Sequence, residues 1–192
     1  MQIHHGDRLL VAALGGPHRC LSSAMRHGGL AVATQVAWVQ VHNTDLPIGV
    51  DPFDVMDARL RAGGVVDAVG LMTSRSLEHF LTARRIVDDV QVDVLATVGL
   101  SNALRIGDLP GFIGSPPGTI NVLARLSVPL TDAALVEAIA MAAEARTAAV
   151  REANVPSRRS GAPSTGTGTE RRARTLMVPG GDPMKPGRSP IR

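Results

Sequence analysis

The fold is decided by residues 30–72, LAVATQVAWVQVHNTDLPIGVDPFDVMDARLRAGGVVDAVGLM, which contain an apolar run, a helix signal and a second apolar run. The apolar runs, residues 30–41 and 65–72, are nearly continuous and rich in β-branched side chains. Such runs are typical of strands buried on both faces. Two strands separated by a helix favour a parallel pair, so we expect parallel pairing between these two segments.

The helix between the two runs has clear start and stop signals. Asp51 is a suitable N-cap, Pro52 occupies the first helical position, and the helix is expected to end at Gly63 and Gly64. The apolar side chains on one face predict that this helix covers the sheet, with three residues buried: Phe53, Met56 and Leu60.

Outside this unit, further apolar runs of strand length occur at residues 8–14, 92–100 and 120–130. Helical spacing predicts a second helix over 74–87 and an alanine-rich third helix from about Thr131 to Ala153. The order of elements therefore predicts an α/β fold: a single layered domain with a mixed, partly parallel sheet, flanked by about three helices.

The charge is distributed unevenly between this domain and the C-terminal tail. Residues 1–150 contain 11 Lys and Arg against 14 Asp and Glu, whereas residues 151–192 contain 9 against 3. A basic tail can bind nucleic acid or an anionic membrane, but its Pro and Gly content favours a solvated segment. We therefore expect an α/β domain over 1–153 and a basic, poorly ordered tail over 154–192.

Composition excludes several other classes of protein. The aromatic residues are three Phe and Trp38, too few for a base-stacking platform, so we expect no nucleic-acid partner. Cys20 is the single cysteine, so no disulfide can form within the chain, which fits a reducing cytoplasm. The N-terminal apolar run is too short for a signal peptide or a membrane span, so we expect a cytoplasmic protein that does not bind membranes.

The densest group of polar residues lies within residues 97–121, TVGLSNALRIGDLPGFIGSPPGTIN. Ser101 and Asn102 follow one apolar run, and Thr119 and Asn121 bracket the start of the next. In an extended chain, Thr119 and Asn121 share a face about 7 Å apart. Such a pair can hydrogen-bond an amide, position water or stabilise an oxyanion, although a loop rich in turn-forming residues is an equal alternative.

Three other positions have both a functional and a structural interpretation. His42 and Asn43 end a predicted strand, where they can meet a ligand or form an ordinary turn. Thr73 lies at a strand-to-helix junction, where helix capping is the simpler interpretation. Glu144 on the third helix can act as a general base or remain solvated. The six histidines have no metal-ligand spacing, so we expect no metal site.

Taken in chain order, several segments resemble the adenosylcobinamide amidohydrolase family of corrinoid salvage. They are CLSSAMRHGG (20–29), VGLMTSRS (69–76), ATVGLSNALRIGD (96–108), GTIN (118–121), AAEARTAAV (142–150) and STGTGTE (164–170). In the helix segment, Ala143 and Arg146 stand where the family pattern has Thr and Lys. Glu170 stands where the Thr-Gly element of the family usually ends in Asp.

The resemblance implies hydrolysis of the amide between aminopropanol and a corrin side chain of adenosylcobinamide, giving adenosylcobyric acid for coenzyme B12 assembly. The corrinoid would be the substrate, and we expect no cofactor. A corrinoid-binding protein without hydrolysis, or an inactive relative, is the alternative. The candidate catalytic residues are Asn102, Thr119, Asn121 and Glu144; the candidate substrate-binding residues are Ser22, Ser23, Gly28, Gly29, His42, Asn43, Thr73, Ser101, Thr167 and Thr169.

The C-terminal sequence departs from the pattern of the family. Members continue from the Thr-Gly element into an apolar strand and an Ala-Gly-Lys-His-Thr-like stretch, whereas here Glu170 is followed by RRARTLMVPGGDPMKPGRSPIR, without histidine. We hypothesise an out-of-frame or diverged end of a GC-rich gene. Reading the coding DNA in its other two frames tests this hypothesis, which fails if neither frame restores the apolar strand and the Lys-His-Thr stretch.

Overall fold

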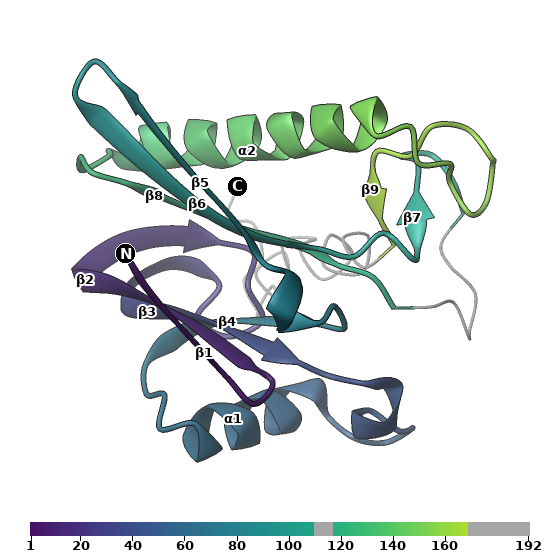
Figure 1. The fold of residues 1–192 in the computed structure, drawn as a ribbon, viewed down its shortest axis with the longest axis horizontal. Coiled ribbons are helices and arrows are strands. Elements are labelled where there is room, and N and C mark those ends of the chain that lie inside the picture. Colours follow the sequence, from purple (N-terminus) through teal and green to yellow (C-terminus); the bar gives the residue numbers. More distant parts are fainter. Residues whose placement is uncertain (110–116, 169–192) are drawn as a thin grey trace, which may run out of the picture.

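The computed structural model describes residues 1–109 and 117–168, which form two sheets, a short two-stranded ribbon and two α-helices (Figure 1). The helices are α1 (Pro52–Ala62) and α2 (Asp132–Glu152), and the 3-10 turns are η1 (Asn43–Asp45) and η2 (Leu77–His79). The strands are β1 (Gln2–Gly6), β2 (Leu9–Ser22), β3 (Gly29–Gln40), β4 (Ala68–Thr73), β5 (Leu81–Val87), β6 (Val90–Val98), β7 (Ala103–Leu104), β8 (Ile120–Leu126) and β9 (Gly166–Thr167).

The first sheet has the strand order β1-β2-β3-β4. β3 and β4 are parallel and the other neighbours are antiparallel, which confirms both the mixed sheet and the predicted parallel pair. The long strand β2 contains a bulge at Gly15 and Gly16, where the register with β3 shifts and φ is 85° and 153°. These backbone angles favour glycine, which has no Cβ to clash.

α1 connects the parallel strands, as the sequence predicts. The Asp51 carboxylate accepts a hydrogen bond from the backbone N–H of Phe53 at 2.9 Å, and Gly63 is the C-cap. A Cβ at Gly63 would lie 2.3 Å from Cδ2 of Leu9, so a larger residue there would require the Leu9 side chain to move. Met56 and Leu60 are buried, but the prediction for Phe53 is wrong because this side chain is 51% exposed.

The second sheet has the order β5-β6-β8, with both pairs antiparallel. Here the helix predicted over 74–87 is wrong: after the single turn η2, the chain forms β5. β5 and β6 are joined by a two-residue turn at Asp88 and Asp89, both with positive φ (46° and 66°), as hairpin turns require. The domain therefore has two α-helices within its described residues instead of about three.

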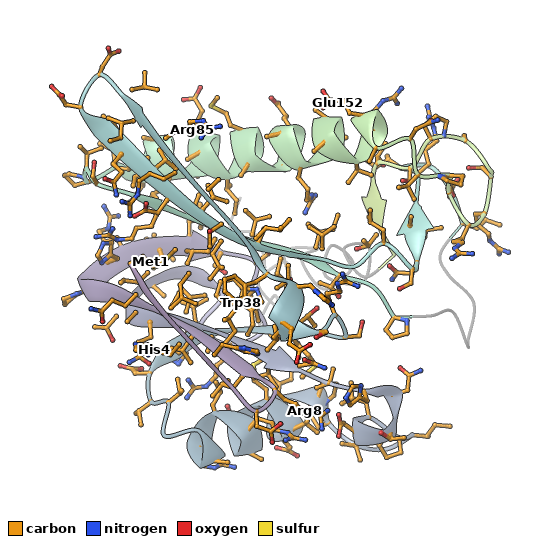
Figure 2. All side chains as sticks on the ribbon, viewed as in Figure 1. Met1, His4, Arg8, Trp38, Arg85 and Glu152 are labelled. Atoms are coloured by element: carbon orange, nitrogen blue, oxygen red, sulfur yellow. The ribbon has the colours of Figure 1, made fainter. Side chains whose placement is uncertain are left out.

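The elements stack as α1, first sheet, second sheet and α2 (Figure 1). Side chains of β2 and β3 alternate between two cores, because successive residues of a strand face opposite sides of the sheet. Trp38 is fully buried in the core between the sheets (Figure 2). That core also contains Leu10, Ala12, Leu14, Val36, Val69, Leu77 and Leu95, and the core under α1 contains Ala37, Val39, Val41, Met56, Leu60, Val65 and Ala68.

The chain after α2 folds back onto the second half of the domain. β9 pairs with β7 in antiparallel register, Ala103 opposite Thr167 and Leu104 opposite Gly166. Ser157 and Ser164 are buried in the connection. Residues 154–168 are thus hydrogen-bonded to the domain, and the predicted poorly ordered tail stays a prediction for 169–192, which lie outside the described residues.

Candidate functional site

The edge of β4 that faces away from β3 is covered by two distant segments of the chain. Gly70 exchanges two backbone hydrogen bonds with Arg26 in the β2–β3 loop, at 3.3 and 3.0 Å. Two residues further along β4, the carbonyl of Met72 accepts a hydrogen bond from Nδ2 of Asn121 at 3.0 Å. Two predicted groups therefore meet at the same strand edge. One is the loop with the candidates between Ser22 and Gly29, and the other is the GTIN segment.

The ends of β6 and β8 bring together the polar residues of the 97–121 stretch. The N–H of Gly99 donates to the carbonyl of Thr119 at 2.9 Å, and the hydroxyl of Ser101 donates to the carbonyl of Pro117. Gly118 packs so closely that a Cβ there would lie 2.4 Å from Oδ1 of Asn102. The sequence needs glycine at 118 because no side chain fits between these two segments.

A pocket of about 220 Å³ opens beside this contact. Its walls are the turn after β4, the end of β6 and the residue before Gly118, which contribute Ser74, Arg75, Ser76, Val98, Gly99, Leu100, Ser101 and Pro117. Thr73 is buried just behind the pocket, where its Oγ1 accepts a hydrogen bond from the N–H of Arg75 at 3.0 Å. The Thr73 hydroxyl thus fixes the turn and does not cap a helix, since the N-cap of η2 is Ser76.

Thr97 adds a buried hydroxyl next to this region. It lies opposite Asn121 in the β6–β8 register, so the two side chains share the face that points toward the first sheet. Thr97 is fully buried, and within the described residues its Oγ1 has no hydrogen-bond partner. Most buried hydroxyls in proteins are paired, so an unpartnered one beside the candidate site requires an explanation.

The Thr-Gly element also reaches this region. The N–H of Gly168 donates to the carbonyl of Asn102 at 3.1 Å, and a Cβ at Gly168 would lie 3.3 Å from Cδ1 of Leu104. The neighbouring Thr167 is 3% exposed, and its Oγ1 has no partner among the described residues. Thr169, the other predicted binding residue of this element, lies outside the described residues.

The remaining candidates lie away from the pocket lining. Glu144 is exposed on α2. His42 and Asn43 are exposed at η1. The N–H of His42 donates to the Asp45 carboxylate at 2.6 Å, as in an ordinary turn. Ser22 accepts a hydrogen bond from the N–H of Ala24, in the same loop as the other candidates, Ser23, Gly28 and Gly29.

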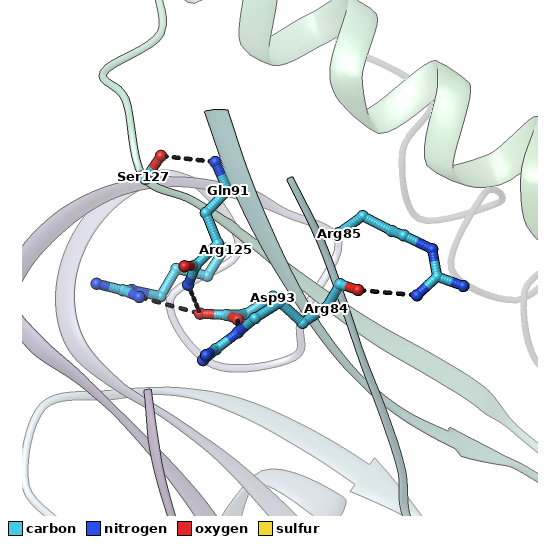
Figure 3. A network of polar contacts seen from close by, with 6 residues as sticks. All are labelled: Arg84, Arg85, Gln91, Asp93, Arg125 and Ser127. Atoms are coloured by element: carbon cyan, nitrogen blue, oxygen red, sulfur yellow. Dashed lines mark hydrogen bonds and ion pairs between the residues drawn. The ribbon is translucent and has the colours of Figure 1, made fainter. Parts of the chain in front are cut away.

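A charged cluster occupies the opposite end of the layer between the sheets (Figure 3). The buried Asp93 carboxylate accepts hydrogen bonds from Nε of Arg84 at 2.6 Å, Nε2 of Gln91 at 3.0 Å and NH1 of Arg125 at 3.2 Å. The Arg84 hydrogen bond is the main cause that holds the pKa of Asp93 below its usual value. The pKa of Asp45 is likewise lowered, chiefly by the hydrogen bond from Arg8.

The sequence profile of the adenosylcobinamide amidohydrolase family matches residues 1–173. The chain belongs to this family. The match includes every described segment that lines or adjoins the pocket. Among the curated members of the family is an adenosylcobinamide amidohydrolase of Halobacterium salinarum, 40% identical over 99 residues, which are 47% of this chain and 41% of that protein. The matched part thus covers about two fifths of the relative, and no solved structure matches this chain.

For this member of the amidohydrolase family, sequence reasoning did not identify Arg75 or Thr97 as site residues. Arg75 lies in a short turn, where no periodic pattern marks its direction. Thr97 lies in a strand whose register with Asn121 becomes known only from the fold. Within the described ranges, no three His, Cys, Asp or Glu side chains gather as a metal site, and no helix is long and apolar enough to cross a membrane.

Proposed function

We propose that this chain hydrolyses the amide that joins aminopropanol to the corrin of adenosylcobinamide, releasing adenosylcobyric acid for reuse in coenzyme B12 synthesis. Family membership supports the reaction class. The observation that carries the proposal is the convergence of residues 73–76, 99–102 and 118–121 beside one pocket. These three segments are separated in the chain, and all of them lie within the family match.

The residues beside the pocket offer hydrogen-bonding groups that hydrolysis of an unactivated amide can use. Water must be positioned for attack on the carbonyl carbon, and the oxyanion that forms must be stabilised by donors. Asn121 uses one N–H for Met72, which leaves its second N–H and its Oδ1 for substrate or water. Asn102 and Thr119 adjoin the same place, so these three residues remain the candidate catalytic groups, whereas Glu144 requires an approach of α2 to take part.

The size of the pocket fixes how much of the substrate it can enclose. About 220 Å³ is less than the roughly 300–1,000 Å³ of most ligand pockets, so it accommodates the amide arm and not a macrocycle. The corrin ring accordingly lies across the mouth of the pocket. In this proposal the corrinoid is the substrate and small-molecule partner, no cofactor is needed, and the reaction takes place in the cytoplasm.

The second candidate function is corrinoid binding without hydrolysis, in an inactive relative. One observation favours it: the described lining of the pocket contains neither a carboxylate nor an imidazole that could act as general base. The atypical sequence after Glu170 points in the same direction. Under this alternative the pocket still accepts the amide arm, but the bond is not cleaved.

One assay separates the two functions. The purified 192-residue chain is incubated with adenosylcobinamide, and adenosylcobyric acid and aminopropanol are quantified by liquid chromatography and mass spectrometry. We expect both products in equal amounts. Corrinoid binding without product, measured by equilibrium dialysis, supports the alternative. The absence of both binding and turnover in a sample with a cooperative thermal transition rejects both functions.

A further inference from the structure

We infer that Arg75 binds the carbonyl oxygen of the scissile amide, and therefore the carboxylate of the acid product. The inference rests on the proposed function, since it assigns a role in that reaction. Arg75 is the one charged side chain among the described residues that line the pocket. The other lining residues contribute hydroxyls, apolar side chains and glycine. The site thus contains one strong anion-binding group.

The guanidinium of Arg75 is available for a ligand. Six of the other described arginines each form an ion pair with an aspartate: Arg8, Arg19, Arg26, Arg59, Arg84 and Arg125. Arg75 is exposed, and within the described residues its side chain forms no hydrogen bond or ion pair. A guanidinium that faces a pocket without a protein partner can bind a planar carboxylate through two parallel hydrogen bonds.

The backbone that carries Arg75 is held on both sides. On the N-terminal side, Thr73 is 1% exposed and its hydroxyl accepts a hydrogen bond from the N–H of Arg75. On the C-terminal side, Leu77 is fully buried and its N–H donates to Oε1 of Gln40 at 3.1 Å. Ser76 accepts a hydrogen bond from the N–H of Glu78 at 3.4 Å. The turn therefore fixes the origin of the side chain, which is a condition for binding a small group in a defined orientation.

The chemistry of amide hydrolysis explains why a cation is useful there. Water adds to the carbonyl carbon, the C–N bond breaks, and the amine leaves with a proton, so a neutral amide and water become a carboxylate and an ammonium ion. Negative charge develops on the carbonyl oxygen in the transition state and remains in the product. Arg75 consequently binds the transition state and the acid more strongly than the amide.

Binding of the two corrinoids tests this inference separately from turnover. Equilibrium dialysis measures the affinity of the wild-type chain, Arg75→Gln and Arg75→Lys for adenosylcobyric acid and for adenosylcobinamide. For Arg75→Gln we expect affinity for the acid to fall about tenfold or more, with a change of less than about threefold for the amide, since bonds to charged groups are the stronger ones. Arg75→Lys should recover part of the loss.

The matched control is Arg61→Gln, which removes the same charge from the exposed surface of α1 and should bind both corrinoids like the wild type. Circular dichroism melting of each variant establishes that it is folded. If Arg75→Gln binds the acid as tightly as the wild type, the inference is wrong even where the wild type hydrolyses the amide. If the wild type binds neither corrinoid, both this inference and the proposed function are wrong.

Discussion

The two ends of the layer between the sheets differ in how their polar groups are satisfied. At one end, the Asp93 carboxylate is bound by Arg84, Gln91 and Arg125 (Figure 3). At the other end, four residues along the same face of β6, the hydroxyl of Thr97 has no partner among the described residues. The buried polar group at the Asp93 end has hydrogen-bond partners, whereas the one at the Thr97 end, beside the candidate site, has none among the described residues.

This difference suggests that the polar residues at one end of the layer stabilise the fold and those at the other end serve the candidate site. A buried charge is tolerated only when its partners offset the loss of hydration, as they do for Asp93. A buried hydroxyl without a partner costs stability, so its retention requires another reason. We therefore expect changes at the Asp93 end to affect folding and changes at the Thr97 and Asn121 end to affect catalysis.

The largest expected effect is that of Asn121→Ala on hydrolysis. This change removes the amide group beside the pocket and the hydrogen bond to Met72, so we expect turnover of adenosylcobinamide to fall at least about 100-fold, as for loss of an oxyanion-type donor. The free energy of unfolding should fall by only about 1 kcal/mol. Steady-state assays and urea denaturation measure both quantities, and full activity would exclude the GTIN segment from the site.

Asp93→Asn should have the opposite effect, lowering stability and leaving activity nearly unchanged. It leaves Arg84 and Arg125 without their counter-charge, and we expect the free energy of unfolding to fall by about 2 kcal/mol, less than for a wholly buried pair because Arg84 is largely exposed. The folded variant should hydrolyse substrate within about twofold of the wild type. Asp88→Asn in the exposed hairpin turn is the control, and an equal loss of stability there contradicts the role of Asp93.

Thr97→Val replaces the unpartnered hydroxyl with a methyl group of similar shape. We expect stability to stay the same or rise by up to about 1 kcal/mol, because a buried polar group without a partner is removed. The turnover number should fall about tenfold if the hydroxyl holds water or substrate, and Thr97→Ser should restore it. Thr82→Val, on the exposed strand β5, should change neither quantity; an active Thr97→Val variant assigns this end to structure alone.

The smallest effect concerns acid stability. Because the pKa of Asp93 is lowered in the folded state, the unfolded chain binds more protons in acid, and stability falls with pH below the unfolded pKa of about 3.9. Urea denaturation from pH 6 to pH 3 should show this decline. Asp93→Asn should lessen this decline, and the lowered pKa of Asp45 should leave a smaller decline of the same sign in the variant. An identical slope in the variant contradicts the prediction.

The parts of the fold that the sequence predicts are those with strong local signals. α1 has an N-cap, a proline and two terminal glycines, and the apolar runs of β3 and β4 are long enough to indicate buried strands. β5 lacks such a signal. Every residue of this edge strand is exposed, so its side chains show no burial pattern, and Leu77 and Phe80 before it imitate helical spacing.

The sequence allowed us to predict which segments contribute to the site, but not how their side chains are arranged in space. Ser101, Asn102 and Asn121 attract attention because small polar residues crowd the ends of apolar runs. Their contact with β4 depends on how the second sheet lies on the first, which pairs Asn121 with Met72, 49 residues away. Glu144 suggests a general base by residue type alone, and the exposed position of its side chain depends on packing that local sequence does not encode.

The hydrogen bond from Asn121 to Met72 also has a consequence for solubility. Uncovered strand edges recruit strands of other molecules and promote aggregation. On β4, the outward carbonyl of Met72 is occupied by a side chain of the candidate site, while Gly70 is occupied by the β2–β3 loop. A residue proposed for chemistry therefore also occupies a backbone acceptor that a strand of a neighbouring molecule could otherwise use, so a change at Asn121 is expected to affect both activity and solubility.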